Sequence, residues 1–283
     1  MNILIPEAEF KCRKRDQLLD YEAYRTRAED LIRRIPNAAK KLGDPEWLSG
    51  RGQDEGALLR LTHARTQYAL DLLSLGYSAG HDIDALRAFF PALLGYVEEY
   101  ARHSEAFNQT DEGLRTQGPH IAIQDVEFTD ANRLLCFAIL LGWQETIPRI
   151  MAIIDYNNPL RDGMLERLAS VYMARPTPLP SECTRHLPYQ RTLVIFDASP
   201  ADRPERMREY LEGWYAASRR EPYYEQHTRD RFLGYWSWEA AAISVALHID
   251  DRGYRDLAFY PRDLAKFGIV SPSADNPLTN PHR

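Results

Sequence analysis

The chain has 283 residues, a formal net charge of −6, and 44% hydrophobic and 27% charged residues. This composition is too apolar and too mixed in charge for an intrinsically disordered chain. The acidic balance argues against direct binding of nucleic acid, because non-specific binding needs clustered lysine and arginine to replace phosphate counterions. The length is close to that at which a single hydrophobic core stops growing, so we expect two packed lobes.

No apolar run in the sequence approaches the roughly 18 residues of a transmembrane helix, and the longest, around residues 134–141, suits a buried helix. The first ten residues lack the basic leader of a secretory signal. Cys12, Cys136 and Cys183 are far apart and form no CxxC pair, which argues against a disulfide framework and a cysteine zinc site. We therefore expect a cytoplasmic protein with reduced thiols and no membrane partner.

The acidic excess lies in the N-terminal half of the chain. Residues 1–127 carry 16 lysines and arginines against 21 aspartates and glutamates, whereas residues 128–283 carry 19 against 20. An acidic surface of this kind suits a basic protein partner. The alternative is that mild acidity only keeps the protein in solution.

Apolar residues recur at helical spacing through the first half of the chain. The pattern predicts long amphipathic helices over residues 18–35 and 55–75, the second ended by Gly76. A third helix is expected to start near Asp82, and Pro91 should bend or interrupt it. This half of the chain is therefore predicted to be helical.

Residues 108–127 are polar and weakly periodic, which indicates a connector. Arg175–Pro188 contains four prolines and is predicted to be a loop. The other segments after the connector are predicted as helices, at 129–141, 144–155, 161–174, 191–196, 204–218 and 231–249. We expect an N-terminal helical domain with connector over 1–127, a C-terminal helical domain over 128–268, and an extended tail over 269–283.

Alternation of apolar and polar residues with period two, flanked by hairpin turns, is missing from almost the whole chain. The sequence therefore predicts an all-α fold with two packed helical lobes of mostly antiparallel helices. No repeated residue pattern identifies a known solenoid.

Gly76-Tyr-Ser78-Ala-Gly80 matches the GxSxG pattern of the hydrolase nucleophile elbow. That elbow needs a buried strand before the serine, whereas an amphipathic helix is predicted there. The favoured interpretation is a helix–turn–helix junction in which Gly76 ends one helix and Ser78 or Asp82 caps the next. A helical hydrolase that uses Ser78 stays an alternative.

Motifs for metals and cofactors are missing from the sequence. It has no HExxH, and its eight histidines are scattered. Glu99 and His103 share a helical face, but without a third ligand they indicate a surface pair. Neither GxGxxG nor GxxxxGK[ST] occurs. We predict no metal and no cofactor.

The stretch from Tyr235 to Asp263 combines aromatic residues with the carboxylates of Glu239, Asp250 and Asp251. These acids suggest a hydrolase or a metal site. A helical hydrolase that uses the three carboxylates is therefore a further alternative. On one unbroken helix, however, Glu239 and Asp250 would lie about 16 Å apart and could not hold one ion. The favoured interpretation is structural, with Glu239 in a buried charge-assisted hydrogen bond and the aspartates organising a turn.

The same stretch resembles the C-terminal domain of the PoNe immunity protein family. The likeness is carried by Gly234-Tyr-Trp-Ser-Trp-Glu239, Asp250-Asp251 and Tyr260-Pro-Arg-Asp-Leu264, with the earlier Trp214-Tyr215. Trp238 stands where the family more often has phenylalanine. Arg15-Asp16 and Tyr77-Ser-Ala-Gly80 resemble the helical N-terminal domain of the family, so the likeness extends over most of the chain.

The resemblance implies a non-catalytic immunity protein that neutralises a cognate nuclease toxin by direct binding. The toxin would be a DNase effector of a contact-dependent route such as type VI secretion, and homo-oligomers stay possible. Because a nuclease needs a basic face for its substrate, we expect acidic side chains to face the toxin. The candidates are Asp54, Glu55, Asp82, Asp84, Glu98, Glu99, Asp111 and Glu112. The motif residues predicted to be structural are Gly234, Tyr235, Trp236, Glu239, Asp250, Asp251, Tyr260 and Pro261.

Overall fold

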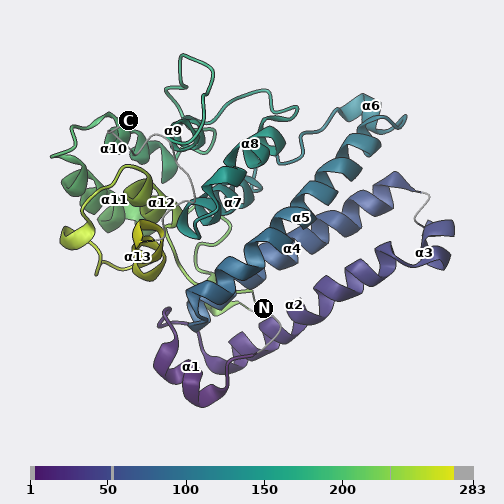
Figure 1. The fold of residues 1–283 in the computed structure, drawn as a ribbon, viewed down its shortest axis with the longest axis horizontal. Coiled ribbons are helices and arrows are strands. Elements are labelled where there is room, and N and C mark those ends of the chain that lie inside the picture. The colour runs from purple at the N-terminus through teal and green to yellow at the C-terminus, as the bar shows by residue number, and fades with distance from the viewer. Residues whose placement is uncertain (1–3, 52–53, 230, 271–283) are drawn as a thin grey trace, which may run out of the picture. The chain divides into compact units, whose positions relative to one another are not determined.

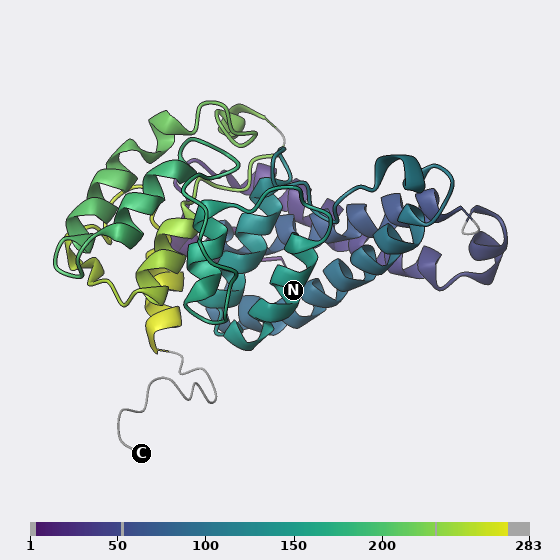
Figure 2. The same cartoon turned by 90° about the horizontal axis from the view of Figure 1, so that it is seen from above.

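A computed structural model describes residues 4–51, 54–229 and 231–270 of the chain. Every regular element within these residues is a helix, and none is a strand (Figures 1 and 2). The predicted all-α fold is confirmed.

Contacts divide the chain into two compact units. The first contains residues 1–131, 152–160 and 219–235, and the second contains residues 132–151, 161–218 and 236–283. Two short segments of the first unit therefore come from beyond residue 127, where the sequence predicts the domain boundary. That boundary stays a prediction.

Three long helices dominate the first unit. The central one, α4, packs against both α2 and α5, and the three run side by side (Figure 1). The helices of this unit are α1 (Glu7–Arg13), α2 (Tyr21–Leu42), α3 (Pro45–Ser49), α4 (Glu55–Ala79), α5 (Ile83–Asn108) and α6 (Gly113–Thr116), followed later by the short helix η4 (Gln226–Thr228). Their amphipathic stripes explain this packing, because Leu31 and Ile35 of α2 and Leu93 and Val97 of α5 are all buried.

The end of α4 differs from the prediction. Gly76 and Ser78 lie inside the helix, which continues to Ala79 and ends at Gly80. Gly80 has a left-handed φ of 94°, and a Cβ atom there would lie 2.2 Å from the carbonyl oxygen of Arg13. Position 80, and not position 76, is therefore the one that requires glycine at the end of this helix. Burial of the whole last turn supports the extra length.

The start of α5 agrees in part with its prediction. Asp82 occupies the N-cap position, but its side chain accepts no capping hydrogen bond. Pro91 lies within α5 and does not interrupt it, because the helix runs on to Asn108. Pro91 is on the exposed side, where water can satisfy the backbone carbonyl that loses its partner.

The second unit contains shorter helices. Those that lie wholly within it are η2 (Gln144–Thr146), α9 (Gly163–Ser170), η3 (Tyr189–Thr192), α10 (Leu193–Asp197), α11 (Arg203–Ala217), α12 (Trp238–Ala246), η5 (Asp251–Gly253) and α13 (Arg262–Val270). Two further helices, α7 (Phe128–Leu140) and α8 (Ile147–Asp155), each have residues in both units. The loop predicted over Arg175–Pro188 contains no helix or strand, as expected.

Two predictions for the last segments need correction. The helix predicted over 231–249 begins only at Trp238, because Gly234 has a φ of 101° and the chain around it is not helical. Ile269 and Val270, predicted as the start of the tail, belong to α13. Residues 271–283, the rest of that predicted tail, lie outside the described residues.

Candidate functional site

Glu239 of α12 is a buried carboxylate whose two oxygens both accept hydrogen bonds. It is 1% exposed, and its Oε1 accepts hydrogen bonds from the Tyr210 hydroxyl at 2.7 Å, the Trp214 indole at 2.8 Å and the Ser237 hydroxyl at 2.6 Å. Its Oε2 accepts one from the Asn132 amide at 3.1 Å. Four neutral donors thus replace the water that the carboxylate loses on burial.

This arrangement occupies both oxygens of the Glu239 carboxylate with hydrogen bonds from the surrounding side chains. The pKa of the neighbouring Cys136 thiol is raised, first by burial and second by the nearby Glu239 carboxylate. Sequence reasoning singled out Glu239 and Trp214 but missed Asn132 and Tyr210. The available signal was the spacing of Tyr210 and Trp214, which places both on one face of α11.

Asp250 and Asp251 lie beyond the end of α12 and are each paired with an arginine. The premise of an unbroken helix from Glu239 to Asp250 is wrong, because α12 ends at Ala246. Asp250 accepts hydrogen bonds from the Arg252 guanidinium, which lowers the pKa of Asp250 to about 2. Asp251 lies 2.6 Å from the Arg255 guanidinium. Both aspartates therefore organise the turn at η5.

Tyr260 belongs to the same turn. Its hydroxyl lies 3.5 Å from Asp251, and its ring meets Tyr254 edge-on at 5.3 Å. Burial raises the pKa of Tyr260 above its ordinary value. The neighbouring Pro261 is also buried. These contacts agree with a packing role for this part of the motif.

The N-terminal motif residues meet Tyr235 within the first unit. Asp16, which is buried, accepts hydrogen bonds from the backbone N–H groups of Leu18 at 2.8 Å and Tyr235 at 2.9 Å. The Arg15 guanidinium donates to the carbonyl oxygens of Tyr77 at 2.9 Å and His81 at 3.0 Å. Segments distant in sequence are thereby joined through backbone groups that are buried or partly buried.

Ser78 takes part in the same junction. It is fully buried within α4, and its hydroxyl donates to the carbonyl oxygens of Ser74 and Leu233. The interpretation of Ser78 as a helix cap is therefore wrong. A hydroxyl in this position is closed to a substrate, so the GxSxG match has no elbow geometry behind it.

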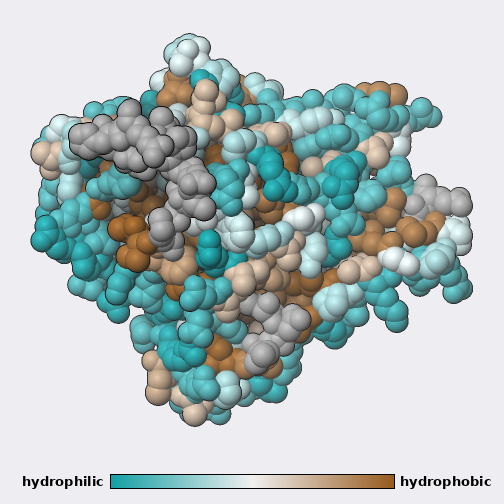
Figure 3. All heavy atoms as spheres, in the orientation of Figure 1, coloured by the Kyte–Doolittle hydropathy of each residue, from teal (hydrophilic) through white to brown (hydrophobic). Residues whose placement is uncertain are grey.

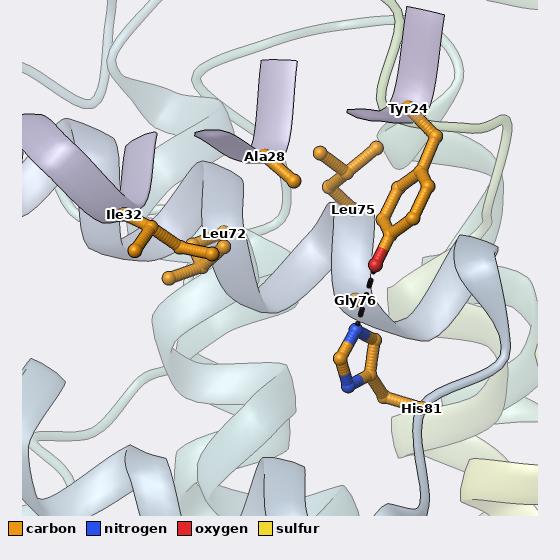
Figure 4. A pocket seen from close by; sticks show the side chains of 7 residues that line it. All are labelled: Tyr24, Ala28, Ile32, Leu72, Leu75, Gly76 and His81. Atoms are coloured by element: carbon orange, nitrogen blue, oxygen red, sulfur yellow. Dashed lines mark hydrogen bonds between the residues drawn. The ribbon is translucent and has the colours of Figure 1, made fainter. Parts of the chain in front are cut away.

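A small hollow lies between α2 and the end of α4, also in the first unit (Figure 4). The Tyr24 hydroxyl points at His81, with 3.1 Å between the oxygen and Nε2, and it accepts a hydrogen bond from the Ile5 N–H at 2.9 Å. Burial, and then the charge of Arg13, lowers the pKa of His81 to about 4. The volume of about 10 Å³ has room for one water molecule, not for a substrate.

Four of the eight acidic candidates for toxin binding are engaged within the first unit. Asp54 caps α4, and Asp82 lies 2.6 Å from the Arg13 guanidinium. Glu99 pairs with the buried Arg65. Glu55 lies 3.6 Å from His103, so Glu99 and His103 have separate partners instead of each other. These interactions reduce the charge that such residues offer to a partner.

Three of the acidic candidates are exposed without such an engagement. Asp84, Asp111 and Glu112 are exposed, and no ion pair of their side chains occurs among the residues that the structure describes. Glu98 is half-buried. The surface seen in Figure 3 is largely hydrophilic with scattered hydrophobic residues.

Within residues 4–51, 54–229 and 231–270, no three histidine, cysteine, aspartate or glutamate side chains are arranged to hold a metal ion. No helix in that same part of the chain is long and apolar enough to cross a bilayer.

The comparisons with known proteins agree with the motif geometry. The family description "PoNe immunity protein (PoNi), N-terminal" matches residues 15–152, and "PoNe immunity proteins (PoNi), C-terminal" matches residues 160–264. The chain belongs to the PoNe immunity protein family. The PoNi N-terminal match starts at Arg15, and the C-terminal match includes Trp214, Glu239 and Tyr260, whose contacts are described above.

A solved structure supports the fold of this PoNi family member. The crystal structure of protein PA2201 from Pseudomonas aeruginosa matches with a TM-score of 0.72 and 20% sequence identity. The match covers 91% of this chain and 90% of that one. At this identity the likeness shows a shared fold. A comparison with curated proteins gave no match.

Proposed function

We propose that this chain binds a cognate nuclease toxin in the cytoplasm and neutralises it by direct protein–protein interaction. The observation that carries the proposal is the family match over residues 15–152 and 160–264, which includes both halves of the immunity protein. The toxin is a PoNe-type DNase effector delivered by type VI secretion.

The charge of the chain supports a nuclease as partner. A DNase must present a basic face to DNA, and a protein with a net charge of −6 is attracted to that face. Within the acidic N-terminal half, Asp84, Asp111 and Glu112 are the candidates whose exposed charge is not offset by an ion pair in the described structure. We assign the first encounter with the toxin to these side chains.

The proposed action is binding without turnover and without a cofactor. Ser78 is buried within a helix, and Glu239 is enclosed by four donors. Asp250 and Asp251 are each paired with an arginine. These contacts support inhibition by contact with the toxin and not by a reaction.

Co-expression with a PoNe-type toxin, the cognate partner in this proposal, tests it. Cells that make the toxin alone should stop growing, and cells that make both proteins should grow. The two proteins should also elute together through affinity and size-exclusion columns. A nuclease toxin of an unrelated family serves as the control and should remain lethal. Continued killing by the PoNe-type toxin, with this chain folded and abundant, would refute the proposal.

A further inference from the structure

The connector between α6 and the start of α7 contains no helix or strand over residues 117–127, which belong to the first unit (Figure 1). Two asparagine side chains fix it at separate points. Asn108 of α5 donates to the carbonyl oxygen of Gly118 at 2.9 Å, and Asn158 donates to that of Ile121 at 2.7 Å. Both are hydrogen bonds between neutral amides, so neither depends on pH.

His120 lies between these two anchors, and its side chain is enclosed. The residue is 2% exposed. Its ring stacks on the Tyr156 ring, with 3.8 Å between the centroids and an interplanar angle of 3°. Its backbone carbonyl oxygen accepts a hydrogen bond from the Tyr100 hydroxyl at 2.7 Å. These contacts hold His120 against α5 and against the residue that follows α8.

The surroundings of the His120 ring define where it carries its proton. Nε2 lies 3.4 Å from the Glu105 carboxylate, which can only accept, so we assign the single proton of the neutral ring to Nε2. Nδ1 then holds a lone pair, and this buried atom has no hydrogen-bond partner among the residues that the structure describes. A second proton must therefore go to Nδ1, where the new N–H would be buried without an acceptor.

The charged and titratable groups near His120 come from three segments. Glu105 and Tyr100 belong to α5, Tyr156 follows α8, and the connector contributes Glu127, whose carboxylate is bonded to the connector backbone. Burial lowers the pKa of His120 from its ordinary value of 6.5, although Glu105 acts in the opposite direction. The side chain of Glu105 is 57% exposed, so water screens its attraction for a charged ring.

We propose that residues 117–123 form an acid-sensitive latch, which opens when the His120 ring takes up a second proton. In the open form the charged ring leaves Tyr156 and enters water, and the latch separates from α5. Segments without a helical hydrogen-bond ladder open locally at a smaller free-energy cost than the whole unit. The helices α2, α4 and α5 stay folded, because they pack directly against one another.

The direction of the pH dependence follows from the two states of the ring. In the open form His120 titrates at its ordinary pKa of 6.5, whereas the closed form takes up the proton less readily. The closed latch is therefore fully stable above pH 6.5 and is weakened as the pH falls below that value. Since one proton is involved, the opening constant should rise by up to about tenfold for each pH unit, until the closed form is protonated too.

Amide hydrogen exchange of the unmodified chain tests the latch and needs no toxin. Protection factors, which are corrected for the intrinsic exchange rate, would be compared at about pH 8 and about pH 5. Residues 117–123 should lose protection by about tenfold or more at the lower pH, and Ile123 reports directly, because its N–H donates to Asn158 at 3.4 Å. The buried residues 69–79 of α4 should keep their protection. Unchanged protection of the latch, or an equal loss in α4, would overturn the inference.

A substitution at His120 separates the latch from other effects of acid. His120→Phe keeps an aromatic ring against Tyr156 and cannot take up a proton, so the protection of its latch should be the same at both pH values. His186→Phe, at an exposed histidine of the second unit, is the matched control and should show the same loss as the unmodified chain. A loss of equal size in His120→Phe would overturn the inference.

NMR titration of the His120 ring in the unmodified chain provides a measurement that stands even if His120→Phe does not fold. The ring should titrate over the same pH range in which the latch loses protection. Titration of this ring while the latch stays protected would overturn the inference.

Discussion

Replacing Glu239 with alanine should lower the free energy of unfolding by about 4 kcal/mol or more, because three buried donors lose their shared acceptor. Each buried donor left without a partner costs about 1–3 kcal/mol, and Tyr210, Trp214 and Ser237 all donate to the same oxygen. Urea unfolding followed by tryptophan fluorescence measures the loss. Trp214 reports directly, since its indole N–H is one of the donors.

Two further variants separate hydrogen bonding from other effects at Glu239. Glu239→Gln keeps an oxygen for the three donors and should cost much less than the alanine substitution. Glu145→Ala, at an exposed position of η2, should change the unfolding free energy by no more than about 0.5 kcal/mol. Equal losses for Glu239→Ala and Glu145→Ala would contradict the assigned role of the carboxylate.

Replacing Glu166 with alanine is expected to cost about 3–5 kcal/mol, the usual effect of breaking a buried ion pair. The side chain of Arg175 is only 6% exposed and would stay buried without its partner. Replacing both residues, with Glu166→Met and Arg175→Met, should recover most of the loss because no unpaired charge is left. Glu212→Ala is the control: its carboxylate lies 3.8 Å from Arg208 on the exposed side of α11, and exposed pairs contribute only about 0–1 kcal/mol.

The contribution of Glu166 should also depend on pH. Its pKa is lower in the folded protein than its ordinary value of 4.5, so the folded state binds this proton less readily than the unfolded state. The stabilisation is fully present above that ordinary value and is lost as the pH falls through the lower folded pKa. The stability difference between the unmodified chain and Glu166→Gln should therefore shrink below pH 4.5. A difference that stays constant into strong acid would contradict the ion pair.

Periodicity located the long helices because their burial repeats with the helical turn, as in Leu31 and Ile35 of α2. It could not determine which glycine ends α4. Gly76 and Gly80 are equally plausible from the sequence, and the choice depends on the close approach of the Arg13 backbone to Gly80. Periodicity also placed the start of α12 too early, because it does not reveal the positive φ of Gly234, which is incompatible with a helix there.

Several contacts around the motif residues also could not be predicted from the sequence. The resemblance to the family singled out Glu239 and Trp214, but Asn132, which donates to the second carboxylate oxygen, is too distant in sequence for any spacing rule. Glu166 and Arg175 are separated by the turn out of α9 and follow no helical period. Long-range hydrogen bonds of this kind require the folded structure.

Purified proteins give the most direct test of the central claim. The DNase activity of the proposed cognate PoNe-type toxin would be measured on linear DNA while this chain is added in increasing amounts. We predict that cleavage falls in proportion to the added chain and ceases near one chain per toxin, as expected for tight binding that blocks the toxin. Undiminished cleavage in the presence of excess folded chain would contradict the assignment as an immunity protein that acts by direct binding.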